Sequence, residues 1–92
     1  MVEFEGKIVN HRVSILIDPE ESLSYLSPKV VELCHLNFSK FKTPCLVQLA
    51  TRAKRRVSAK VENCQLEIVG QPIRVNLNML LLGSFDVLIG MD

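Results

Sequence analysis

The chain has 92 residues and a formal net charge of +1, and hydrophobic residues make up 48% of it. This length predicts one domain with a modest core, and the small net charge excludes a bulk electrostatic attraction to nucleic acid or to a membrane. No apolar run is long enough to span a bilayer, so we expect no membrane association.

The cysteines and the N-terminal residues indicate the compartment. Cys34, Cys45 and Cys64 lie far apart and lack the spacing of a metal site. The first residues do not show the basic start and apolar stretch of a signal peptide. We therefore expect reduced thiols, no metal ion, no cofactor and an intracellular location, either cytoplasmic or nuclear.

The first predicted elements are a hairpin, a short strand and a helix. VSILI alternates through Val13, Ile15 and Ile17 and predicts a strand that ends at Asp18. EGKIV is its expected partner strand in a hairpin. Pro19 lacks a backbone donor and ends that strand. SLSYL is consistent with a short strand. Ser27 as a cap and Pro28 as the first helical residue predict a helix over about 28–35.

The second half of the chain consists of further strands. PCLVQLA and RVSAKVENCQLEIV flank a polar tip and predict a hairpin over about 46–61. PIRVNLNMLLL alternates, and VLIG is a short apolar strand that ends at a glycine. Many short strands separated by turn residues predict an all-β domain, either a small barrel or a sandwich.

Two phrases far apart in the sequence resemble a known family. ILIDPEESLSYLSPKVVE and FDVLIGMD are similar to the retropepsin-like aspartic protease domain of long-terminal-repeat retrotransposons, especially the Gypsy-type elements of plants. In that family an aliphatic strand runs into Asp-Ser/Thr-Gly-Ala, and a later aliphatic pair followed by glycine packs beneath the active site. The resemblance covers nearly the whole chain. It implies a small closed acid-protease barrel with one short helix and a flap hairpin.

The resemblance also implies a mechanism and a set of site residues. Asp18 would be the catalytic aspartate, contributed by each subunit of a homodimer that cleaves extended peptides during processing of a retroelement Gag-Pol polyprotein. The two carboxylates would share a proton. The implied site further comprises the active-site loop Pro19, Glu20 and Glu21, the flap tip Thr51, Arg52 and Ala53, and Leu88, Ile89 and Gly90 under the active site.

The sequence departs from the family pattern at several of these positions. Pro19 replaces the hydroxyl residue, Glu20 replaces the glycine, and Glu21 replaces a small residue. Arg52 occupies a flap position that is usually glycine, where a positive φ costs about 1 kcal/mol. Retropepsins generally continue past GMD, so we expect a single domain, 1–92, that lacks the C-terminal helix and the dimer strand. A catalytically inactive, protease-derived binding or assembly module is therefore the alternative function.

Two residue groups also have simpler interpretations. By its spacing alone, Asp18 would be a solvated acid at the end of a strand. The basic group at the hairpin tip could bind phosphates or could be a solvated tip, and it comprises Arg52, Lys54, Arg55, Arg56 and Lys60. No aromatic residue lies between these charges to stack on bases, so we do not expect nucleic acid as a partner.

Overall fold

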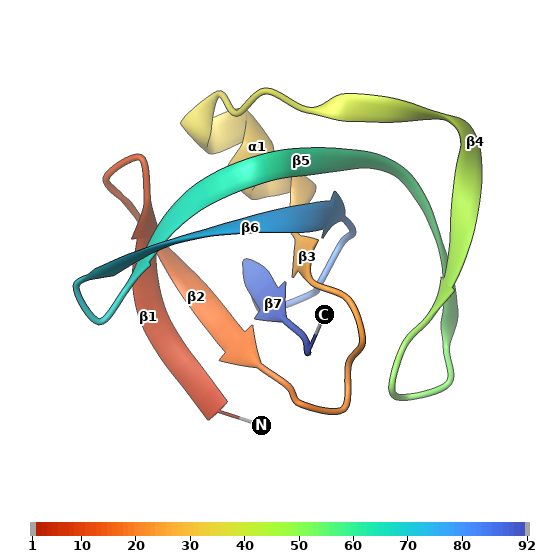
Figure 1. Ribbon diagram of the computed structural model, residues 1–92, viewed down its shortest axis with the longest axis horizontal. Coiled ribbons are helices and arrows are strands. Elements are labelled where there is room, and N and C mark those ends of the chain that lie inside the picture. The colour runs from red at the N-terminus through yellow and green to blue at the C-terminus, as the bar shows by residue number, and fades with distance from the viewer. Residues whose placement is uncertain (1, 92) are drawn as a thin grey trace.

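The computed structural model describes residues 2–91 and contains a seven-stranded sheet with one short helix. The elements in chain order are β1 (Val2–Ile8), β2 (His11–Ile17), β3 (Tyr25–Leu26), α1 (Pro28–Cys34), β4 (Ser39–Gln48), β5 (Lys54–Ile68), β6 (Gln71–Met79) and β7 (Val87–Ile89). The order across the sheet is β1-β2-β7-β3-β6-β5-β4 (Figure 1). The expected all-β class with one short helix is confirmed.

A second pairing of β1 closes the sheet on itself. Besides its antiparallel partner β2, β1 pairs with the end of β5 through Gly6 and Lys7. A Cβ at Gly6 would collide with the carbonyl oxygen of Glu67 and with the side chain of Ile15. Only glycine lets the two backbones cross at this distance, so Gly6 is a condition for closing the barrel.

β7 lies inside the fold between two strands from the first third of the chain. It runs parallel to β2, where Ile15 faces Val87, and antiparallel to β3, where Tyr25 faces Leu88. Ile15, Val87 and Tyr25 are almost completely buried. A strand that is hydrogen-bonded on both edges and buried on both faces has a continuous apolar sequence. The sequence of β7, VLI, fits this pattern.

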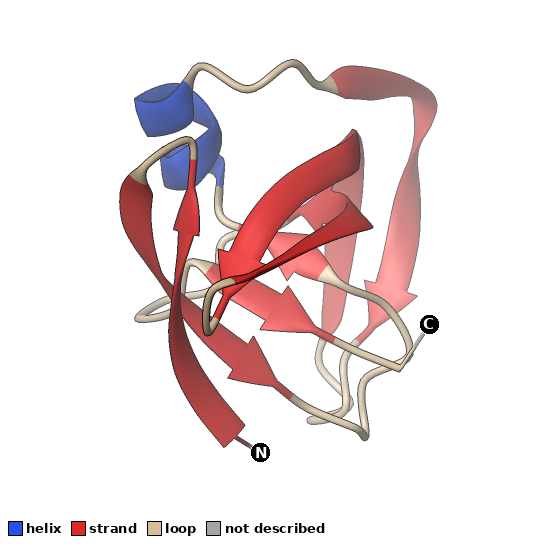
Figure 2. Cartoon of the chain, turned by 60° about the vertical axis from the view of Figure 1, so that its left-hand side comes forward, coloured by secondary structure: helices blue, strands red, loops and turns tan. Residues whose placement is uncertain are grey.

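The helix begins and ends with its expected signals. The Ser27 side chain accepts a hydrogen bond from the Lys29 backbone N–H, Pro28 follows the cap, and His35 ends the helix in the left-handed conformation. Val30, Val31 and Cys34 face the core at one end of the sheet (Figure 2). Burial raises the pKa of the Cys34 and Cys64 thiols, which keeps both protonated. No helix in residues 2–91 is long and apolar enough to cross a membrane.

The β4–β5 hairpin is longer than the sequence predicted. Pairing begins at Ser39 opposite Lys60, seven residues earlier than the expected start, and a register shift lies between Lys40 and Cys45. This irregular stretch contains Pro44, which made the first half of the strand hard to recognise. A proline is tolerated here because β4 is an edge strand, with no partner on its outer side in the sheet order.

Two hairpin turns hold valine in the left-handed region. Val9 and Asn10 connect β1 to β2 with φ of 49° and 66°, and Val69 and Gly70 connect β5 to β6 with φ of 51° and 76°. Positive φ at both central residues is the type I′ geometry, which favours Asn-Gly. A β-branched residue is strained in this conformation, and Val69 is also 74% exposed, so packing offers little compensation.

Replacing Val69 should therefore stabilise the fold. We expect Val69→Asn to raise the free energy of unfolding by about 1 kcal/mol, because Asn adopts the left-handed conformation more readily. Urea unfolding should show a higher midpoint with an unchanged slope. Val69→Thr is the matched control, since it is polar but still β-branched and should give no gain. An equal gain in both variants would mean that removing an exposed apolar side chain, and not backbone strain, is responsible.

Candidate active site

Asp18 lies at the end of β2, where the chain leaves the sheet. Its backbone N–H donates to the carbonyl oxygen of Ile89 at 2.9 Å, which extends the β2–β7 ladder by one residue. Its side chain is half-buried, and its Oδ1 accepts the N–H of Glu20 at 3.0 Å. The Asp18 carbonyl oxygen accepts the N–H of Glu21 at 3.1 Å, so the loop forms a compact turn around this residue.

The residues expected under the active site form the floor of this loop. Leu88 is buried, and Ile89 and Gly90 are half-buried. The Gly90 N–H donates to the Ser24 hydroxyl at 3.1 Å, and a Cβ at Gly90 would meet the carbonyl oxygens of Leu23 and Glu21. Backbone atoms cannot move aside as a flexible side chain can, so glycine is required for this close approach.

The three residues after Asp18 differ in their exposure to solvent. Pro19 and Glu20 are exposed, whereas Glu21 is only 5% exposed. The Glu21 Oε1 accepts the backbone N–H of Ala50 at 2.6 Å, and its carbonyl oxygen accepts the N–H of Met91 at 2.8 Å. A carboxylate that bonds a backbone N–H makes a short, charge-assisted hydrogen bond. Glu21 thus links the Asp18 loop to the tip of the β4–β5 hairpin, which lies beside it in Figure 1.

The hairpin tip keeps a tight turn in spite of its missing glycine. The Arg52 N–H donates to the Leu49 carbonyl oxygen at 2.8 Å, and the Leu49 N–H donates to the Ala53 carbonyl oxygen at 2.9 Å. Arg52 has a φ of 69°, which is the conformation that glycine usually supplies. Thr51 and Arg52 are exposed and Ala53 is half-buried. The tip therefore forms a tight turn with Arg52 in the left-handed conformation, which is unfavourable for a residue with a side chain.

Two further residues shape the site, and the sequence indicated no role for either. Ser24, which is buried, holds Gly90 from the side of the loop. Asp86 accepts the N–H of Ser14 through Oδ2 at 2.8 Å, and its carbonyl oxygen accepts the N–H of Ser27 at 2.8 Å. Asp86 therefore fixes β2, the start of β7 and the helix cap to one another. Its position directly before VLIG was the available signal.

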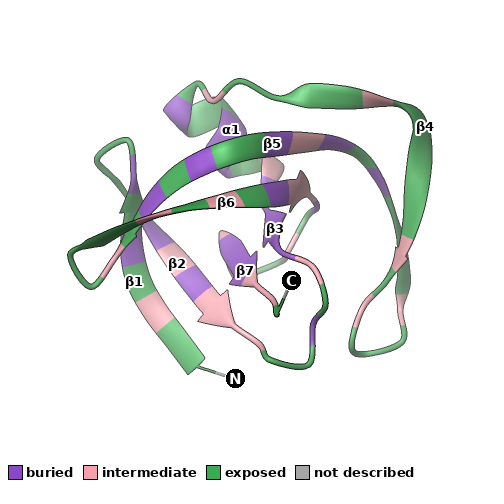
Figure 3. Ribbon diagram, viewed as in Figure 1, coloured by how far each residue is buried: buried purple, intermediate pink, exposed green. Residues whose placement is uncertain are grey.

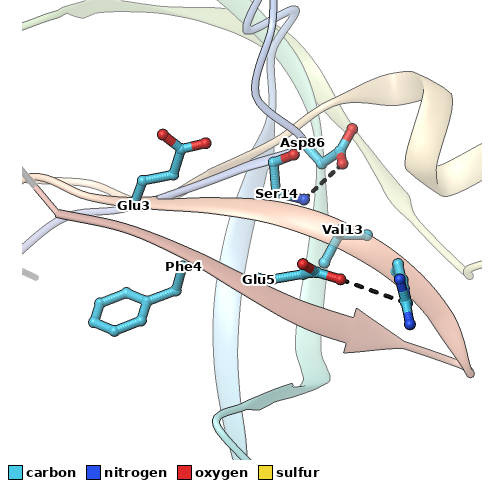
Figure 4. A pocket seen from close by; sticks show the side chains of 7 residues that line it. Glu3, Phe4, Glu5, Val13, Ser14 and Asp86 are labelled. Carbon is cyan, nitrogen blue, oxygen red and sulfur yellow. Dashed lines mark hydrogen bonds and ion pairs between the residues drawn. The ribbon is translucent and has the colours of Figure 1, made fainter.

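A surface hollow lies away from these residues. It has a volume of about 510 Å³ and is lined by residues of β1 and β2 and by Asp86 (Figure 4). An ion pair between Arg12 and Glu5 at 3.4 Å occupies part of it, and both side chains are largely exposed. None of the predicted site residues lines this hollow. Within residues 2–91 no group of three or more His, Cys, Asp or Glu could hold a metal ion.

Comparison with known proteins gives a family and a fold. The family model for retroviral aspartyl proteases matches residues 3–92. The crystal structure of the retroviral protease-like domain of Ddi1 from Leishmania major is similar to this chain, with a TM-score of 0.71 and 13% identity. The similarity covers 100% of this chain and 73% of the Ddi1 chain. At this identity the similarity concerns the fold alone. No curated protein matches the sequence.

The Glu21–Ala50 bond can be tested by amide hydrogen exchange. In Glu21→Ala we expect the Ala50 amide to exchange at least about ten times faster, because a hydrogen bond to a charged group contributes about 2 kcal/mol. The Arg52 amide is an internal control, since its bond to Leu49 lies within the turn. Glu21→Gln keeps an acceptor oxygen and should give an intermediate rate. Unchanged protection of Ala50 in Glu21→Ala would contradict the link between loop and hairpin.

Proposed function

We propose that this chain, which belongs to the retroviral aspartyl protease family, is an endopeptidase domain in which two copies each contribute Asp18 to one active site. The observation that carries the proposal is the position of Asp18. It follows β2, in which Val13 and Ile15 are buried. The Asp18 N–H donates to Ile89, and the N–H of Glu20 orients the Asp18 carboxylate. The family match over residues 3–92 supports the same assignment.

The proposed chemistry requires a second carboxyl group. In aspartic-type hydrolysis one carboxylate takes a proton from water as a general base, and a protonated carboxyl donates to the scissile carbonyl. The two carboxyl groups of such a site lie in direct contact and share one proton, because two negative charges so close together cannot both form. Each chain supplies one Asp18, so a homodimer is the minimal catalytic unit.

The substrate in this proposal is a peptide in an extended conformation. It would lie between the Asp18 loop and the β4–β5 hairpin, the two segments that the Glu21–Ala50 bond connects. An extended peptide satisfies its backbone groups by pairing with strand edges, as β-strand addition does in other peptide-binding proteins. Opening the hairpin to admit it requires breaking the bond from Ala50 to Glu21.

The biological setting is part of the proposal. Both phrases that carry the resemblance favour a domain of a Gypsy-type plant retrotransposon that processes a Gag-Pol polyprotein inside the cell. Residues 1–92 form one domain in this proposal.

A second candidate function is a catalytically inactive binding or assembly module. The observation that favours it is the loop after Asp18, where Pro19 provides no N–H and Glu20 and Glu21 add two carboxyl groups per chain. Glu21 also holds the hairpin tip against the loop through its hydrogen bond with the Ala50 N–H. Such a domain would retain the barrel and its surfaces but would not turn over peptides.

The test is the cleavage of unstructured peptides at mildly acidic pH, followed by mass spectrometry. The endopeptidase proposal predicts specific activity that rises with protein concentration, since the dimer is the active form. We expect Asp18→Asn to abolish cleavage. Adding Asp18→Asn chains to the wild-type protein should lower the activity of the wild-type chains, because mixed dimers contain only one Asp18. Glu67→Gln, which neutralises an exposed acid on β5, is the control and should keep full activity.

Two results would decide between the candidates. A strict monomer in sedimentation equilibrium, with no cleavage at any pH, would refute the endopeptidase and leave the inactive module. Residual cleavage in Asp18→Asn would refute the role of Asp18. We further expect Glu20→Gly to increase cleavage, because it restores the small residue of the family and removes one carboxyl group next to each Asp18. A decrease in Glu20→Gly would mean that Glu20 itself contributes to activity.

A further inference from the structure

The charges of this chain are segregated to a degree that its net charge of +1 conceals. Seven of the eleven Lys and Arg residues lie between Lys40 and Lys60, and none of the ten Asp and Glu residues lies between residues 33 and 61. The rest of the chain is correspondingly acidic. Because interactions with ions depend on local charge, a single segment of this kind is an electrostatic surface of its own.

These basic residues are carried by the β4–β5 hairpin, and we call the paired part, Ser39–Gln48 with residues 54–60, the basic ribbon. β4 is the edge strand of the sheet, and all of its residues except Phe41 and Val47 are exposed (Figure 3). Six of the seven basic residues are exposed, and Lys60 is half-buried. The charges are thus available to a ligand from solvent.

Three of the basic residues point outward from the same strand. Val57, Ala59 and Val61 of β5 are buried and face the core. Lys54, Arg56 and Lys60 alternate with that set and therefore share the outer face. Residues two positions apart in a strand are about 6.8 Å apart, so Lys54 and Arg56 are neighbours on this face, and Lys60 continues the row beyond Ser58.

The row is almost uncompensated. Within residues 2–91, Lys60 is the one member of the basic group in an ion pair, with Glu62 at 3.4 Å. Leu46 and Gln48, which lie opposite Arg56 and Lys54 in β4, carry no charge. Like charges in neighbouring positions repel one another, so the ribbon is best stabilised by an external anion with repeated negative charges.

One aromatic ring lies beside the row in space, although no aromatic residue separates Lys54, Arg56 and Lys60 in the sequence. The Lys60 ammonium lies 5.7 Å from the centre of the half-buried Phe41 ring, which also packs against a buried cluster. Phe38, directly before β4, is 47% exposed and is open to contact with a ligand. Cations combined with aromatic rings are the pattern that binds single strands through phosphates and base stacking. An anionic membrane has a flat charged surface, and its binding does not require cations arranged in a row beside an aromatic ring.

We propose that the outer face of the basic ribbon binds the phosphate backbone of single-stranded nucleic acid. The buried side chains of β5 face the opposite way, so this surface does not use Asp18 and its function does not depend on peptide cleavage. The binding has no base specificity, because the residues involved provide charge and stacking and no defined set of base contacts.

The experiment is fluorescence anisotropy with a labelled oligo(U) RNA, titrated at several salt concentrations. We expect the triple variant Lys54→Gln, Arg56→Gln, Lys60→Gln to bind about tenfold or more weakly, and its slope of log affinity against log salt to shrink by about 2. The matched control is Lys7→Gln, Lys29→Gln, Arg74→Gln, which removes the same charge from exposed positions outside the ribbon and should keep the wild-type slope.

A second set of measurements separates nucleic-acid binding from unfolding and from the binding of any polyanion. Lys60 also contacts Phe41, so the triple variant could unfold. The double variant Lys54→Gln, Arg56→Gln keeps this contact, and we expect it to reduce the slope of log affinity against log salt by about 1.4. Phe38→Ala should weaken binding to oligo(U) but not to poly-glutamate. Equal losses in the ribbon variant and its control would overturn the proposal. Binding of poly-glutamate or phosphatidylserine vesicles as tight as that of oligo(U) would also overturn it, and would assign the ribbon to another class of partner.

Discussion

The architecture of this domain depends on the insertion of β7 between β2 and β3. Three residues, Val87–Ile89, hydrogen-bond on both edges and hold together strands that belong to the first third of the chain. The insertion is possible because Gly90 has no side chain where the loop carbonyl groups approach. Asp18 takes its position from this contact, since its N–H continues the ladder to Ile89. Fold and candidate site therefore rest on the same few backbone hydrogen bonds.

Much of the fold was predictable because its signals are local. The alternation in VSILI, the Ser27–Pro28 cap and the apolar run VLI each identify an element on their own. The long first half of β4 was missed because Pro44 and the shifted register hide the alternation. In the turn after β5, Gly70 is a recognisable turn residue, but Val69 gave no signal because valine is disfavoured in a type I′ turn.

The site was less predictable than the fold because its contacts join distant residues. The sequence showed that Glu21 replaces a small residue of its family but indicated no partner for it. The structure instead buries Glu21 and gives it the Ala50 N–H as a partner. Periodicity cannot reveal a bond between residues 29 positions apart. The same applies to Phe41 of the basic ribbon, whose ring is close to Lys60 only after β4 and β5 have paired.

The parallel pairing of β2 with β7 has a consequence for the order of events during synthesis. Ile15 pairs with Val87, so the floor beneath Asp18 forms only after almost the entire described chain has left the ribosome. Contacts between such distant residues are slow to form because a long loop must close first. The β4–β5 hairpin, which is complete at Ile68, can form earlier. A domain assembled in this order would display its basic surface before its aspartate is in place, and every incomplete chain would remain without a formed site.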